Sequence, residues 1–185
     1  MEFILQSCKL RSWQLDDAKE VAKQANNENI ARNLRDGFPY PYRIKHARFW
    51  IKSVLKNTQN INLAIELDGK VVGSIGFFPF DDVYRLSGEI GYWLAEPHWG
   101  KGIVTEAVTV LTDYIFQHSD IVRIQAEVFQ QNPASARVLE KAGYKREATL
   151  EKSVVKSGVL MDAWMYVKLK GQEKNKKEST LRENL

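Results

Sequence analysis

The stretch that most constrains this chain runs from Gly88 to Ala107 and reads GEIGYWLAEPHWGKGIVTEA. Its first part alternates with a period of two over Glu89–Ala95, which predicts a β-strand that ends at the following proline. Apolar residues then recur at helical spacing and predict a helix over 102–118. Two glycines, Gly100 and Gly102, join the two elements. The sequence therefore predicts a strand, a glycine turn and a helix N-terminus in direct succession.

A helix that begins at a glycine turn can bind an anion. Its first turn has backbone N–H groups without partners and carries the positive end of the helix dipole. Glycines remove the Cβ atoms that block a ligand, so the amides from Trp99 to Val104 are expected to converge on a phosphate-bearing cofactor. The alternative is that Gly100 and Gly102 only make a tight connection. Thr105 stands where the dinucleotide fingerprint needs a third glycine, and no Walker loop is found, which argues against hydride transfer and nucleotide hydrolysis.

Two separated motifs, in a fixed order, resemble those of one protein family. The run GYWLAEPHWGKGIVTEAV is followed downstream by QNPASARVLEKAGY. Together they resemble the GNAT (Gcn5-related) N-acetyltransferases, within them the branch typified by bacterial ribosomal-protein-alanine N-acetyltransferases. The family signature Q/R-x-x-G-x-G/A is met at Gly100 and Gly102 but not at its first position, which is Pro97 here. Predicted strands and helices compatible with the family fold extend over residues 3–169.

Length and composition are those of one ordinary globular domain. The chain has 185 residues, of which 44% are hydrophobic and 27% charged. Its net charge of +4 comes from scattered basic residues, which suit an anionic cofactor and predict no nucleic-acid partner. Cys8 is the one cysteine, which excludes an internal disulfide and fits a reducing compartment. We find no secretion signal and no membrane-spanning run, and so expect a cytoplasmic protein without a membrane partner.

The order of elements predicts a mixed α/β (α+β) fold, a twisted and mostly antiparallel sheet of about seven strands with flanking helices, as in the GNAT fold. Strands are expected over 3–13, 61–67, 71–80, 89–95, 122–129, 144–150 and 159–169, and helices over 16–25, 30–34, 46–57, 102–118 and 133–142. Asp68-Gly69 predicts a two-residue hairpin turn. Asn132 is expected to cap the last helix at its start and Gly143 at its end. We expect a domain over 1–170 and a polar, mobile tail over 171–185.

The resemblance implies direct transfer of an acetyl group from acetyl-CoA to a primary amine in a ternary complex, without a metal. The pantetheine arm is then expected along Leu94 and Ala95, with a backbone N–H near Leu94 polarising the thioester carbonyl. The diphosphate is expected at residues 100–105, here called the cofactor loop, where Lys101 adds charge. The expected cofactor-binding residues are Leu94, Ala95, Gly100, Lys101, Gly102, Ile103, Val104, Thr105 and Asn132.

An amine must lose a proton before it attacks, and Glu89 is the candidate base, acting directly or through a water. It lies near the centre of its predicted strand and shares a face with Trp93, so partial burial is expected. The alternative is an exposed residue or an ion-pair partner of Arg85 or Arg123. Glu127, on the neighbouring strand, is the rival base.

The departing thiolate needs a proton or a hydrogen bond. Many family members use a tyrosine, but Leu139 holds that place here. The branch resembled has N-x-x-S-x-R instead, matched by Asn132, Ser135 and Arg137. Ser135 is thus the candidate donor to the sulfur. Asn132 is expected to hold the pantetheine or the loop, although an N-cap role alone explains an asparagine before Pro133.

The acceptor side is expected among aromatic residues, namely the Phe38–Tyr42 loop, Trp50 and either Phe77 or Phe78. The same surface suits a dimer contact, so a homodimer is left open. The N-terminal amine of a protein is the expected acceptor. A polyamine, amino acid or aminoglycoside is the alternative, as is a non-catalytic sensor of acyl-CoA. The three histidines are too far apart for a metal site.

Overall fold

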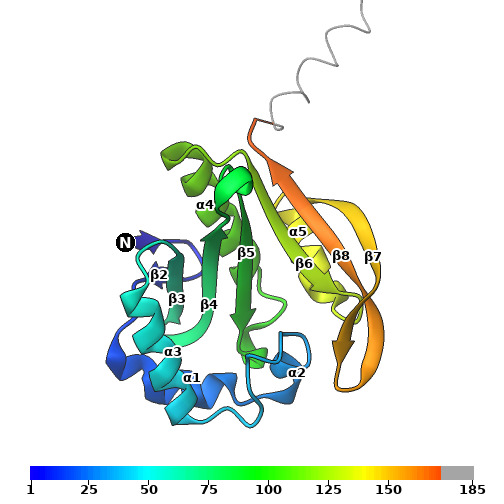
Figure 1. Cartoon of the computed structure of the whole chain (residues 1–185). Helices are drawn as coiled ribbons and strands as arrows, with labels where there is room; N and C mark the ends of the chain where they lie inside the picture. Colours follow the sequence, from blue (N-terminus) through cyan, green and yellow to red (C-terminus); the bar gives the residue numbers. More distant parts are fainter. Residues whose placement is uncertain (172–185) are drawn as a thin grey trace, which may run out of the picture.

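The computed structural model describes residues 1–171 and shows, within them, one sheet of eight strands in the order β1-β2-β3-β4-β5-β6-β8-β7 (Figure 1). Neighbouring strands are antiparallel except β5 and β6, which are parallel. The predicted fold class is confirmed. The predicted tail lies, from residue 172 onward, outside the described residues. No helix among the described residues is long and apolar enough to cross a bilayer.

The strands and helices follow the predicted order closely. The strands are β1 (Glu2–Ile4), β2 (Lys9–Arg11), β3 (Ile61–Leu67), β4 (Lys70–Pro79), β5 (Ser87–Leu94), β6 (Arg123–Phe129), β7 (Lys145–Lys156) and β8 (Val159–Leu169). The helices are α1 (Ala18–Ala25), α2 (Glu28–Ala31), α3 (Ile44–Lys56), α4 (Ile103–His118) and α5 (Pro133–Lys141).

The single N-terminal strand that we predicted is wrong. Two short strands, β1 and β2, form a hairpin there, and the amide of Leu5 donates to the carbonyl of Cys8 at 2.9 Å. Gln6 and Ser7 form the turn, and their amides donate to the carboxylate of Glu106 on α4 at 2.8 and 3.0 Å. The turn is therefore stabilised by a distant carboxylate, which local strand propensity cannot indicate.

Three local predictions are confirmed in the backbone. Asp68 and Gly69 join β3 to β4 with φ of 49° and 74°, as a two-residue hairpin turn requires. The side-chain oxygen of Asn132 accepts the amide of Ser135 at 3.2 Å and caps α5. Gly143, with φ of 88°, follows the last residues of that helix.

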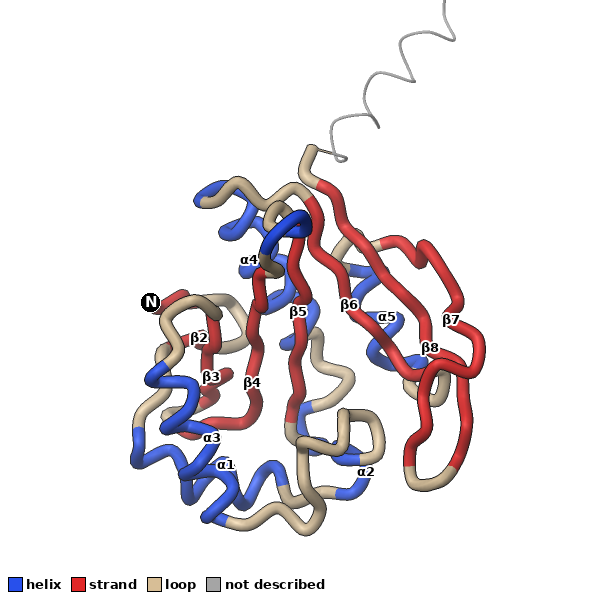
Figure 2. The backbone as a smooth tube through the Cα atoms, viewed as in Figure 1, coloured by secondary structure: helices blue, strands red, loops and turns tan. Residues whose placement is uncertain are grey.

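Helices cover both faces of the sheet (Figure 2). On the α4 face, Ile90 and Leu94 of β5 belong to the larger buried cluster together with α4 residues such as Leu111. On the opposite face, the α1–α3 face, Trp93 packs against a second cluster built around α1 and α3. Side chains alternate along a strand, so Glu89 lies on the α1–α3 face with Trp93.

The parallel strands β5 and β6 stay together only at their beginnings. They pair over Ser87, Gly88 and Glu89, and the register does not continue beyond Glu89 and Gln125. Figure 1 shows the two strands diverging from that point. This region, called the splay here, leaves one edge of β5 without a strand partner in its second half.

Candidate active site

The edge of β5 that faces the splay presents backbone donors. The amide of Ala95, just after the strand, donates to the carbonyl of Val72 at 2.8 Å and so points toward β4. In an antiparallel ladder the direction alternates with each residue, which turns the amides of Ile90, Tyr92 and Leu94 away from β4. The amide of Ile90 belongs to the last parallel bridge with β6, so those of Tyr92 and Leu94 face the splay. The amide of Leu94 therefore faces the splay, whereas the amide of Ala95 is used within the sheet.

The cofactor loop begins α4 with an open backbone. Gly100 and Gly102 have φ of 73° and 81°, and an ideal Cβ at either position meets no atom within 4 Å. The first bond of the helix is donated by Glu106 to the carbonyl of Gly102 at 3.0 Å, so the amides of residues 103–105 precede the helical ladder. The amide of Trp99 donates to the preceding turn instead. The donors available to an anion therefore start at Gly100, one residue later than expected.

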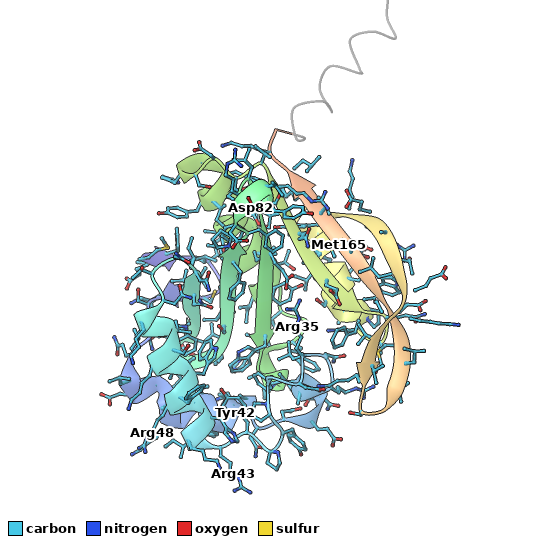
Figure 3. The ribbon with its side chains drawn as sticks, in the orientation of Figure 1. Arg35, Tyr42, Arg43, Arg48, Asp82 and Met165 are labelled. Atoms are coloured by element: carbon cyan, nitrogen blue, oxygen red, sulfur yellow. The ribbon has the colours of Figure 1, made fainter. Side chains whose placement is uncertain are left out.

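Glu89 is paired, but with neither of the arginines considered from the sequence. Its Oε1 accepts Nη2 of Arg35 at 2.9 Å, and the Glu89 side chain is 25% exposed while that of Arg35 is 71% exposed. Figure 3 shows Arg35 in front of the splay. Arg123 pairs with Glu147, and Arg85 donates to a backbone carbonyl. Arg35 lies 54 residues before Glu89 in the chain, so no spacing in the sequence pointed to this pair.

Arg35 belongs to a segment, residues 32–36, that is tied to the far side of the splay. The carbonyl of Arg32 accepts Nε2 of Gln131, which follows β6, at 2.7 Å. The carboxylate of Asp36 accepts Nζ of Lys156, at the end of β7, at 2.7 Å. Contacts to Glu89 on β5, to Gln131 and to Lys156 thus connect this segment to both sides of the splay. We call it the strap.

Ser135 lies in the first turn of α5 and contacts a residue of β5. Its Oγ is 2.9 Å from the hydroxyl of Tyr92, and its carbonyl is 3.3 Å from the same hydroxyl. Asn132 holds the amide of Ser135 as a helix cap, and Arg137 pairs with Glu140 at 3.1 Å on the surface. Tyr92 could not be predicted as a site residue, because alternation shows only that it shares a strand face with Ile90 and Leu94.

The aromatic residues expected at the acceptor side fall into different places. Phe78 is 38% exposed and lies opposite the candidate base in the β4–β5 ladder. Phe77 is buried on the α4 face, and Trp50 packs into the cluster of α1 and α3. Phe38 packs edge-on against Trp93, with 5.9 Å between ring centroids. Phe78 is therefore a partly exposed aromatic residue directly across the ladder from the candidate base.

Two further features bear on nucleophilic and metal chemistry. Cys8 is buried, and burial raises the pKa of its thiol, which disfavours the nucleophilic thiolate. Within residues 1–171, His, Cys, Asp and Glu side chains form no group of three able to hold a metal ion.

At the splay, a carboxylate lies on one face of β5 and a hydroxyl on the other, beside a helix that begins at a glycine turn. This is the arrangement implied by the resemblance to the GNAT acetyltransferases. A family model described as Acetyltransferase (GNAT) domain matches residues 8–145. The chain belongs to the GNAT acetyltransferase family, as the two sequence motifs predicted.

Known proteins similar to this chain agree with the family. The probable N-acetyltransferase YjcK of Bacillus subtilis is 40% identical over 95 residues, about half of each chain (51% and 52%). The SPbeta prophage-derived uncharacterized N-acetyltransferase YokL of the same organism is 30% identical over 155 residues, 83% of this chain and 84% of its own. The structure of RimL, a ribosomal L7/L12 α-N-protein acetyltransferase in complex with coenzyme A, superposes with a TM-score of 0.81 at 19% identity, over 90% and 96% of the two chains. These findings confirm an N-acetyltransferase and coenzyme A as the carrier that the family uses, and they leave the acceptor open.

Proposed function

We propose that this protein transfers the acetyl group of acetyl-CoA directly to the N-terminal amine of a protein. One observation carries the proposal: β5 turns unpaired amides toward the splay and leads into the cofactor loop, while Glu89 and the Tyr92–Ser135 contact lie on opposite faces of that same strand. An amine on one face and a leaving thiolate on the other then meet at the edge of β5.

The residues present fit coenzyme A. A diphosphate needs convergent N–H donors, and the amides of the cofactor loop precede the helical ladder of α4 with no Cβ in front of Gly100 or Gly102. The amide of Leu94 is the donor for the thioester carbonyl. Asn132 uses its side-chain oxygen on the helix cap, and its NH₂ group suits a carbonyl of the pantetheine arm. Lys101 adds a positive charge to the loop. Acetyl-CoA supplies an activated acyl thioester when bound.

Glu89 takes the proton that the acceptor amine gives up. The Arg35 guanidinium occupies its carboxylate in the structure, and an acceptor ammonium makes the same kind of charged hydrogen bond. Because Arg35 is largely exposed, displacing it costs only about 0.2–1 kcal/mol. The carboxylate then accepts the proton directly or through one water, and Ser135 donates a hydrogen bond to the departing sulfur.

The acceptor approaches Glu89 from the α1–α3 face. The strap crosses the splay on that side, and the half-exposed ring of Phe78 lies beside the base, where it suits the first side chains of a peptide. RimL is named as an α-N-protein acetyltransferase, which favours a protein N-terminus over a small amine. A cytoplasmic location and a homodimer stay predictions, as do the domain over 1–170 and its tail.

An acetyl-transfer screen tests the proposed acceptor. The full chain is incubated with acetyl-CoA and peptides that differ in their first residues and contain one internal lysine. Each peptide is tested with a free N-terminus and again with its N-terminus blocked. Mass spectrometry is expected to find one acetyl group on the free N-terminus and none on the blocked peptide. Faster acetylation of a polyamine, amino acid or aminoglycoside contradicts the protein acceptor, and binding of acetyl-CoA without transfer to any amine indicates a sensor.

A further inference from the structure

Tyr92 places a phenolic hydroxyl at the splay in contact with the candidate donor to the sulfur. It lies on β5 beyond the last residue that pairs with β6, and its ring packs against the large cluster on the α4 face. Its hydroxyl reaches Ser135 in the first turn of α5, at 2.9 Å from Oγ and 3.3 Å from the carbonyl oxygen. Two segments 43 residues apart in sequence are thereby joined by one side chain at the candidate active site.

The two hydroxyls have complementary roles. Burial raises the pKa of Tyr92, so the phenol keeps its proton at neutral pH. The hydroxyls allow two hydrogen-bond arrangements. In the first, Tyr92 donates to the carbonyl of Ser135, and the Ser135 hydroxyl donates to Tyr92. In the second, Tyr92 donates to Ser135 Oγ, and the Ser135 hydroxyl is free to donate to a third group. A departing thiolate is such a group. Without the phenol, the serine hydroxyl can turn into any of three staggered positions.

We propose that Tyr92 is the positioning residue that orients the hydroxyl of Ser135 toward the leaving sulfur. The inference rests on the function proposed for Ser135. Tyr92 does not contact the reacting atoms in this arrangement. Ser135 Oγ accepts a hydrogen bond from Tyr92 and donates one to the departing thiolate. Both hydroxyls keep their protons, and the negative charge stays on the sulfur.

Tyr144, a buried tyrosine, provides a control. The hydroxyl of Tyr144 is 2.7 Å from Oγ1 of Thr112 on α4, and both side chains are buried. Tyr144→Phe removes a tyrosine hydroxyl and its hydrogen bond to another hydroxyl, as Tyr92→Phe does, but it leaves Ser135 with its partner. Both variants keep the ring, so packing is conserved and any shared loss of stability is common to the pair.

The test is a double-mutant cycle on the full chain, with kcat and the KM for acetyl-CoA measured for Tyr92→Phe, Ser135→Ala, the double variant and Tyr144→Phe. We expect Ser135→Ala to lower kcat by about 100-fold. Tyr92→Phe is expected to lower kcat roughly tenfold with little change in KM, since the donor is misplaced but present. In the Ser135→Ala background, Tyr92→Phe is expected to have no further effect, because its target is gone. Tyr144→Phe is expected to leave kcat unchanged.

The outcomes separate this inference from the proposed function. If Ser135→Ala keeps the wild-type kcat, the role of Ser135 itself is overturned. If Ser135→Ala lowers kcat but Tyr92→Phe does not, or lowers it equally in both backgrounds, only the positioning role of Tyr92 is overturned. A loss of kcat in Tyr144→Phe as large as in Tyr92→Phe shows a general effect of losing a hydrogen-bonded tyrosine hydroxyl, and it also overturns the positioning role.

Discussion

Replacement of Gly102 by alanine separates the folding of the cofactor loop from its proposed function. Gly102 has φ of 81°, and a Cβ there meets no atom within 4 Å, so the cost to folding is the left-handed backbone alone. For an alanine that cost is about 1–2 kcal/mol. At about 2–4 °C per kcal/mol for a chain of this size, the melting temperature is expected to fall by roughly 2–8 °C.

The expected effect on coenzyme A is larger. If a diphosphate binds the amides of residues 103–105, the new methyl group lies in its path and at least one hydrogen bond to a charged oxygen is lost. Such a bond is worth about 1.5–3 kcal/mol, which raises the Kd for coenzyme A roughly 10- to 150-fold.

Gly158 provides the control for this prediction. It lies in the turn between β7 and β8 with φ of 78°, and a Cβ there also meets no atom within 4 Å. Gly158→Ala therefore carries the same backbone cost without touching the cofactor loop. Thermal melts and calorimetric titrations with coenzyme A are measured on both variants. Equal Kd values for the two variants refute the reasoning, whether both match the wild type or both are weakened.

Three further predictions address the base, its partner and the loop support. Glu89→Gln is expected to lower kcat at least about 100-fold in steady-state assays, and a larger loss in Glu127→Gln assigns the base to that residue instead. Arg35→Ala removes an exposed competitor worth about 0.2–1 kcal/mol and is expected to lower the acceptor KM about 1.4- to 5-fold, while a raised KM means that Arg35 contacts the acceptor. Burial raises the pKa of Glu106, but hydrogen bonds from Ser7 and its neighbour outweigh it and leave that pKa lowered. The Glu106 carboxylate therefore adds stability above its unfolded pKa of about 4.3, and this contribution is lost as pH falls through the lower folded pKa. Glu106→Gln is expected to lower the free energy of unfolding by about 1 kcal/mol at pH 7 and to have no effect in acid, as measured by denaturant unfolding. A loss that does not change with pH contradicts this prediction.

Local chemistry made much of the fold predictable. The turn at Asp68-Gly69 and the cap at Asn132 depend on conformational preferences and hydrogen bonds within a few residues, and both occur as predicted. The glycines of the cofactor loop were predictable for the same reason, since left-handed backbone before a helix is a local property.

The parts that could not be predicted depend on partners far apart in the chain. The N-terminal hairpin needs the carboxylate of Glu106, and Glu89 is paired with Arg35 because the strap returns across the splay. The Tyr92 hydroxyl meets Ser135 only because α5, which packs against α4, β7 and β8, brings its first turn to the Tyr92 side chain of β5. Periodicity indicates on which face of a strand or helix a side chain lies, but not which residue from a distant part of the chain contacts it there.

The central claim is that the amides beginning α4 bind the diphosphate of coenzyme A. Calorimetric titration of the wild-type chain with coenzyme A, dephospho-coenzyme A and phosphopantetheine tests it most directly. We expect one site for the first two ligands, which both carry the diphosphate, and at least about tenfold weaker binding of phosphopantetheine, which has the arm but a single phosphate. No heat with coenzyme A, or equal affinity for phosphopantetheine, contradicts the claim.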